Sequence, residues 1–171
     1  MPTYLRVIRA PSHLTFYERE VLSRDYNLNH DEYHPDILDD YRTEDGNLSL
    51  FLLDSDQELL PLIICAVVAE LGRNSARGYA LLDESILLSQ GLSSPMPTKG
   101  NTTSTEINDR HYNVQLRTTQ ARLELAHTVV DKCPVDSILA SDMKIHLINF
   151  HNSKDIVIRN PGLKKNLGIA G

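Results

Sequence analysis

The sequence predicts a single domain of the α/β (or α+β) class, with a small, at least partly parallel sheet of three to four strands. Two observations support this class: a composition typical of globular proteins, and a strand–helix–strand pattern in the first half of the chain. With 171 residues, 41% hydrophobic and 23% charged, the chain can bury a core of its own. We expect one domain over residues 1–171, with a buried crossover helix and a helical C-terminal half. A four-helix bundle that includes only a hairpin is the alternative fold.

The strand–helix–strand pattern is the strongest structural signal. Residues 47–53 (NLSLFLL) form a nearly continuous apolar run, which is typical of a strand covered on both faces. A helix that is apolar almost all round follows over residues 59–71, and residues 79–82 (YALL) predict a second strand. Ser55 and Glu58 have the spacing of a capping box before this helix. Because the unit has the length of a parallel crossover, we expect the two strands to lie side by side and point the same way.

The flanking segments are weaker predictions. Residues 3–8 (TYLRVI) predict a strand, and residues 14–22 have the apolar spacing of a short helix. Residues 83–90 predict a helix that ends before Gly91. Residues 92–108 are rich in Ser, Thr, Pro, Gly and Asn, so we expect a long polar loop, a mobile flap or a linker there.

The C-terminal half is expected to be mainly helical. Between residues 112 and 133, apolar side chains recur at alternating steps of four and three, which predicts one helix of about six turns. Residues 142–150 predict a helix, although their pattern also fits a strand. Residues 155–158 (DIVI) predict a short strand. The segment 160–168 (NPGLKKNLG) has Asn, Pro and Gly at the positions that begin and end a short helix.

Acidic residues are concentrated in one part of the chain. From Asp25 to Glu58 there are eleven Asp and Glu residues and one Arg, although the whole chain has a net charge of only −6. Such a segment repels nucleic acid and would attract a protein with a basic surface; the alternative is an ordinary solvated surface. The residues that we assign to partner binding are Asp31, Glu32, Asp36, Asp39, Asp40, Glu44 and Asp45.

A second candidate site lies after the two predicted strands. Asp54 and Asp56 follow the first strand, and Asp83 and Glu84 follow the second. If these strands are parallel neighbours, their carboxylates meet at one sheet edge, where Mg²⁺ could bind and assist catalysis. The alternative is that these residues only begin helices. The chain has no Gly-rich phosphate loop and no evident basic residue nearby to hold a phosphate.

Two histidine patterns predict no site. His30 and His34 are four residues apart, but Pro35 keeps His34 from helical geometry, so the two do not share a helical face. Arg122 and His127 have a spacing found in some helical ribonucleases. They lie about 140° apart on a helix, however, so we expect Arg122 in solvent and His127 beside the apolar face.

Cysteine use and hydropathy suggest a cytoplasmic protein. Cys65 and Cys133 both lie in apolar runs, which indicates two buried free thiols in a reducing compartment. The N-terminus lacks the apolar stretch of a signal peptide. The longest apolar run, residues 59–68, has about half the length of a membrane span, so no membrane association is expected.

Two functions of different classes follow. The first is a non-enzymatic interaction or regulatory protein, of the antitoxin, immunity or bacterial defence-accessory type, which binds a basic protein partner through its acidic face and needs no cofactor or metal. The second is a Mg²⁺-dependent phosphoryl hydrolase or nuclease that uses the four carboxylates, with residues 92–108 as a lid. Self-association through the predicted helix over residues 112–133 is a third possibility. Binding to nucleic acid is not expected of the first.

Overall fold

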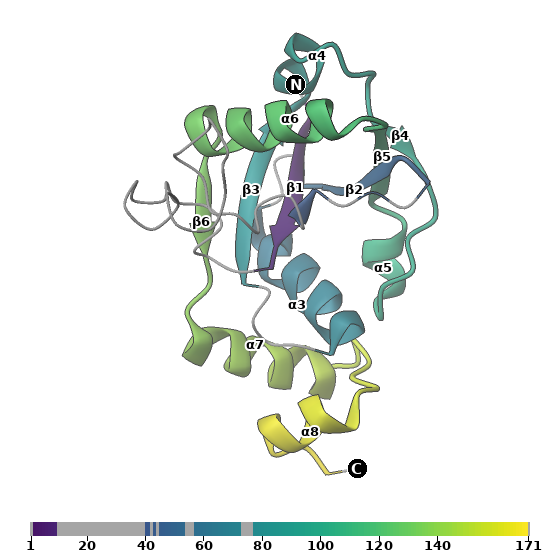
Figure 1. The fold of residues 1–171 in the computed structure, drawn as a ribbon. Coiled ribbons are helices and arrows are strands. Elements are labelled where there is room, and N and C mark those ends of the chain that lie inside the picture. Colours follow the sequence, from purple (N-terminus) through teal and green to yellow (C-terminus); the bar gives the residue numbers. More distant parts are fainter. Residues whose placement is uncertain are drawn as a thin grey trace.

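The structure is a computed structural model that describes residues 2–9, 40–41, 43, 45–53, 57–72 and 77–170. Its centre is a six-stranded sheet with the strand order β4-β5-β2-β1-β3-β6 (Figure 1). Every pairing between these strands is antiparallel. The strands are β1 (Thr3–Ile8), β2 (Asn47–Leu52), β3 (Gly78–Asp83), β4 (Met96–Pro97), β5 (His111–Gln115) and β6 (Val135–Ser137).

This sheet corrects the expected fold class. Strand β1 lies between β2 and β3 and is antiparallel to both, so β2 and β3 run in the same direction but do not pair. The domain is therefore α+β, with six antiparallel strands instead of a partly parallel sheet of three to four. The prediction was wrong because an apolar run shows that a strand is covered on both faces, but not which strand lies beside it.

Helices cover both faces of the sheet. They are α3 (Leu60–Leu71), α4 (Glu84–Ser89), α5 (Thr105–Asn108), α6 (Thr119–Lys132), α7 (Ala140–Asn152) and α8 (Pro161–Leu167), with a single 3₁₀ turn (Gln57–Leu59) before α3. Helix α6 crosses one face of the sheet, whereas α3 lies on the other face, with α7 packed on α3 and α8 beyond α7 (Figure 1). Within the described residues, no helix is both long and apolar enough to cross a bilayer.

Alternate residues of the strands build two separate cores. Leu5 and Phe51 face α3 and pack with Ile64, which is fully buried. The neighbouring residues Tyr4 and Leu50 face the other side and join the core under α6. This alternation is the period of two that a strand imposes on its side chains. Because a helix layer covers each face, both sets of strand residues are apolar, as the continuous run in β2 predicted.

Several predicted elements are confirmed. Strand β1 and the strand segments at 47–52 and 78–83 are present, as is helix α3, whose first turn contains Pro61. Residues 142–150 belong to helix α7 and are not a strand. Helix α8 has the expected ends, since the Asn160 side chain accepts a 3.0 Å hydrogen bond from the Leu163 amide and Gly168 has a φ of 72°.

Other predictions are wrong. The helix expected from residue 112 begins only at Thr119, because residues 111–115 form strand β5 beside β2. The loop expected over residues 92–108 is not among them: residues 92–95 and 98–104 form no helix or strand, although the segment also contains β4, α5 and the fully buried Ile107. Residues 155–158 form no strand; their isoleucines pack into the α3 core instead. The helix predicted at 14–22, and Ser55 of the capping box, lie outside the described residues.

Helix α3 is expected to contribute most to stability through its buried face. The substitution Ile64→Ala removes a fully buried side chain between helix and sheet, so we expect a loss of about 2–5 kcal/mol in the free energy of unfolding. The matched control Ile145→Ala removes the same atoms from an exposed position on α7 and should cost about 0.5 kcal/mol or less. Urea unfolding of both variants measures the difference; equal losses would contradict the assignment of α3 as the core helix.

Candidate functional site

The candidate site is a cavity where strands β1 and β2 separate. These strands pair at only two positions, Tyr4–Leu52 and Leu5–Phe51, whereas β1 pairs with β3 at six. Beyond Leu5, β2 leaves β1 at a wide angle (Figure 1). The resulting cavity has a volume of about 560 Å³, and its lining residues are Arg6, Val7, Arg9, Asp40, Asp45, Asn47, Ser49, Phe51, Val67, Glu70, Leu71, Lys99, Asn101, Thr102, His111 and Asn113.

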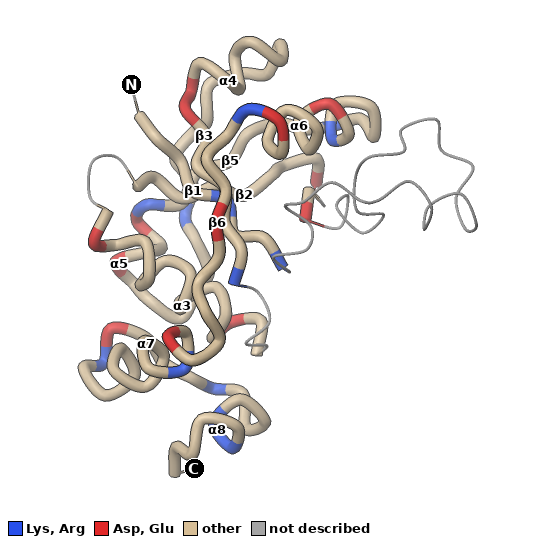
Figure 2. The backbone as a smooth tube through the Cα atoms, turned by 90° about the vertical axis from the view of Figure 1, so that its left-hand side faces the viewer, with Lys and Arg blue, Asp and Glu red and all other residues tan. Residues whose placement is uncertain are grey.

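Charges of opposite sign are balanced at the mouth of the cavity. Arg9 and Lys99 are exposed and basic, and Asp45 and Glu70 are exposed and acidic. Figure 2 shows that acidic and basic residues are also interspersed over the rest of the described chain. With two basic and two acidic side chains, the described part of the mouth has no net charge.

Arg6 lies deeper in the cavity and bridges the gap between the strands. Its Nη1 donates a 2.8 Å hydrogen bond to the carbonyl oxygen of Ser49 in β2. Its Nε and Nη2 both donate to the carbonyl oxygen of Asp40. Burial lowers the pKa of the Arg6 guanidinium, and the charge of Asp40 opposes this effect. Arginine remains charged in proteins, so a positive charge is fixed at this point.

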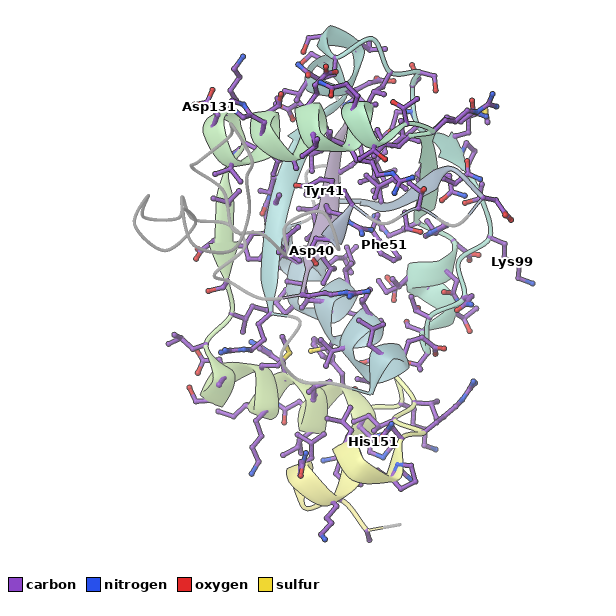
Figure 3. The ribbon with its side chains drawn as sticks, in the orientation of Figure 1. Asp40, Tyr41, Phe51, Lys99, Asp131 and His151 are labelled. Atoms are coloured by element: carbon purple, nitrogen blue, oxygen red, sulfur yellow. The ribbon has the colours of Figure 1, made fainter. Side chains whose placement is uncertain are left out.

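Asp40 holds the chain against the end of β1. Its side chain is only 1% exposed, and its Oδ1 accepts a 2.7 Å hydrogen bond from the backbone N–H of Arg9. Figure 3 shows Asp40 and Tyr41 near the middle of the molecule, next to β1. Of the residues assigned to partner binding, Asp40 is thus buried and Asp45 is exposed. The others, Asp31, Glu32, Asp36, Asp39 and Glu44, lie outside the described residues.

His111 forms part of the opposite wall. Its Nδ1 lies 2.7 Å from the Thr98 hydroxyl oxygen, and its ring contacts Phe51 edge-on, with ring centroids 5.3 Å apart. Burial lowers the pKa of His111, a hydrogen bond with Thr98 opposes this, and the positive charge of Arg6 lowers it further. The neutral imidazole is therefore the favoured form near pH 7.

The Lys99–Thr102 segment of the rim is fixed by Asn108. The Asn108 Oδ1 accepts a 2.6 Å hydrogen bond from the Thr102 amide and a 2.9 Å bond from its hydroxyl, while its Nδ2 donates to the Thr102 carbonyl. A side chain at Gly100 would lie 2.9 Å from the Asn108 Cα, so this close approach requires glycine. This segment is therefore a fixed part of the cavity wall.

The structure places two of the four predicted carboxylates. Asp83 is the last residue of β3 and Glu84 begins α4, whereas Asp54 and Asp56 lie outside the described residues. Thr3 of β1 stands between the two strand ends, where its hydroxyl donates a 2.8 Å hydrogen bond to Asp83 Oδ1 and its carbonyl accepts from the Leu53 amide. Strands β2 and β3 are thus separated by β1 and lie about 9–10 Å apart, so they are not the parallel neighbours that the magnesium hypothesis assumed. Among the described residues, no group of three His, Cys, Asp or Glu could hold a metal.

The remaining sequence candidates give mixed results. Cys65 and Cys133 are free and buried, as predicted. Arg122 is half-buried and His127 is exposed, the reverse of the expected arrangement on α6. His30 and His34 lie outside the described residues.

Sequence reasoning missed the cavity because its residues come from distant segments. One signal was available: Arg6 is the only charged residue within the apolar strand TYLRVI. A charge at a half-buried strand position costs free energy unless it is paired. Its presence in a strand therefore indicates a pairing partner or a functional role.

Comparison of the chain with protein-family models, with curated proteins and with solved structures gave no match. The fold and the cavity define the class of protein: an α+β domain with a cavity of mixed polar and apolar lining in an opened sheet.

The Asn108 side chain is expected to hold the rim in place. Asn108→Ala removes the acceptor of the Thr102 amide and hydroxyl, so we expect a loss of about 1–3 kcal/mol in unfolding free energy. Hydrogen exchange at the Thr102 amide should become faster in this variant. Asn101→Ala is the control, because Asn101 is exposed in the same segment. Unchanged exchange at Thr102 would show that the rim does not depend on Asn108.

His111 is expected to make stability depend on pH. Its pKa in the folded state is lower than the ordinary value of 6.5, so just below pH 6.5 the unfolded chain binds more protons than the folded chain. This contribution therefore lowers stability as the pH falls from about 7.5 to about 5.5. Urea unfolding at both pH values should show a smaller loss for His111→Gln than for the wild type. The control variant His146→Gln, in α7, still contains His111, so it should retain the contribution of His111 to the fall in stability between the two pH values.

Proposed function

We propose that this protein is a ligand-binding protein of the regulatory type, and that the cavity between β1 and β2 is its binding site. The observation that supports this proposal is the built cavity of about 560 Å³, which lies within the size range of small-molecule sites. Its walls come from the central strands and from α3, whose buried residues belong to one hydrophobic core.

The lining fits a small ligand that is partly apolar. Val7, Phe51, Val67 and Leu71 provide an apolar wall on the α3 side. Asn and Ser side chains from β2 and β5 provide hydrogen-bonding groups on the sheet. A few placed polar groups against an apolar wall are typical of sites that orient a small molecule. The balanced charges at the mouth favour a ligand with little net charge over a polyphosphate.

Blocking the cavity tests this proposal. Asn113→Phe places an aromatic side chain in the cavity on β5, where an aromatic residue suits a strand. The wild type is screened by thermal unfolding against a panel of amino acids, organic acids, nucleosides and sugars. A ligand at about 100 times its Kd adds about 2.7 kcal/mol, which for a chain of this size raises Tm by about 5–10 °C. Asn113→Phe should abolish the rise.

The matched control is Gln115→Phe, two residues further along the same strand and not part of the lining. It should leave the ligand-induced rise in Tm unchanged. The proposal is wrong if no compound of the panel stabilises the wild type, or if Asn113→Phe and Gln115→Phe respond to the ligand alike.

A further inference from the structure

We propose that the cavity recognises a small organic carboxylate, and that Arg6 is the residue that binds the carboxylate group. This inference rests on the proposed ligand-binding function and adds the chemical class of the ligand. It depends on three features of Arg6: the hydrogen bonds it makes, the donors it retains, and the groups around it.

The hydrogen bonds of Arg6 fix the guanidinium without using all its donors. A guanidinium has five N–H donors. Three of them are occupied by the carbonyl oxygens of Asp40 and Ser49. Two N–H groups are left, one on each terminal nitrogen, and Arg6 lines the cavity. A guanidinium with a donor left on each terminal nitrogen can offer both to the two oxygens of a carboxylate, which arginine binds in a bidentate manner.

Among the described residues, the charge of Arg6 is only partly compensated. Its hydrogen-bond acceptors are neutral backbone carbonyls, and the Asp40 carboxylate is instead directed to the Arg9 amide. Burial already disfavours the charged form of Arg6, so a ligand anion beside the guanidinium would offset part of its desolvation free energy. The rigid attachment to two carbonyls means that little side-chain entropy is lost on binding.

The surroundings favour a carboxylate over a phosphate. Arg6 is the deeper cation, whereas Arg9 and Lys99 are exposed at the mouth, together with Asp45 and Glu70. Figure 3 shows Lys99 at the outer edge of the molecule. A dianionic phosphate would meet one inner cation and a rim whose two basic and two acidic residues cancel, whereas a single carboxylate is matched by the one charge of Arg6. The apolar wall of Val67 and Leu71 can hold the body of the ligand.

The experiment compares each carboxylate with its uncharged amide of almost the same shape. The probes are acetate and acetamide, succinate and succinamide, glutamate and glutamine, and benzoate and benzamide, with inorganic phosphate as a further anion. Calorimetry on the full chain at constant ionic strength should show at least a tenfold tighter Kd for the carboxylate in one or more pairs. Phosphate should bind more weakly than that carboxylate.

Arg6→Lys tests the role of the paired guanidinium N–H donors, because lysine keeps the charge but cannot bind a carboxylate in a bidentate manner. We expect at least a tenfold loss of affinity for the carboxylate and little change for the amide. Arg77→Lys is the matched control, since Arg77 is also half-buried and donates to a backbone carbonyl, that of Ile138, outside the cavity. It should not alter carboxylate affinity.

The outcomes separate this inference from the proposed function. If amides bind as tightly as carboxylates and Asn113→Phe abolishes both, the cavity binds ligands but the carboxylate assignment is wrong. If carboxylates are preferred but Asn113→Phe has no effect, the site lies elsewhere and both proposals are wrong. Absence of binding by every probe, preference for phosphate, or equal effects of Arg6→Lys and Arg77→Lys would each overturn the carboxylate proposal.

Discussion

The separation of β1 from β2 is the constraint on which the site depends. Two neighbouring strands normally satisfy their backbone groups by pairing along their length. Here the pairing stops after Leu5 and Phe51, and the Arg6 side chain hydrogen-bonds to the Ser49 carbonyl across the gap. The same guanidinium holds the Asp40 carbonyl, and the Asp40 carboxylate binds the Arg9 amide. One strand residue thus keeps the sheet open and also places a positive charge in the opening.

The rest of the fold keeps this opening rigid. Helix α3 closes one side of it with Val67 and Leu71, and α7 packs on α3 from the outside. On the other side, the segment around Thr102 is tied to Asn108 by three hydrogen bonds. Because a cavity costs packing contacts, it persists only where the surrounding elements cannot collapse into it. The two cores, one on each face of the sheet, provide that rigidity.

The sequence predicted more of the elements than of their arrangement. The apolar run in β2, the apolar helix α3 ended by Gly72 and the Asn160–Gly168 ends of α8 each depend on residues near in sequence, and each is present. The predicted helix over residues 112–133 was wrong in its first part, because apolar residues at 112, 114 and 116 also fit a strand. The pairing of residues 111–115 with β2 decided between the helical period and the strand period.

The sequence by itself therefore determined the positions of most strands and helices, the burial of both cysteines and the apolar character of α3, since these follow from local periodicity and hydrophobicity. Only the tertiary structure decided the strand order, and with it the presence of the cavity. The physical reason is the distance along the chain between interacting groups. Arg6 acquires its role from Asp40 and Ser49, which are 34 and 43 residues away, and no local pattern specifies that they meet.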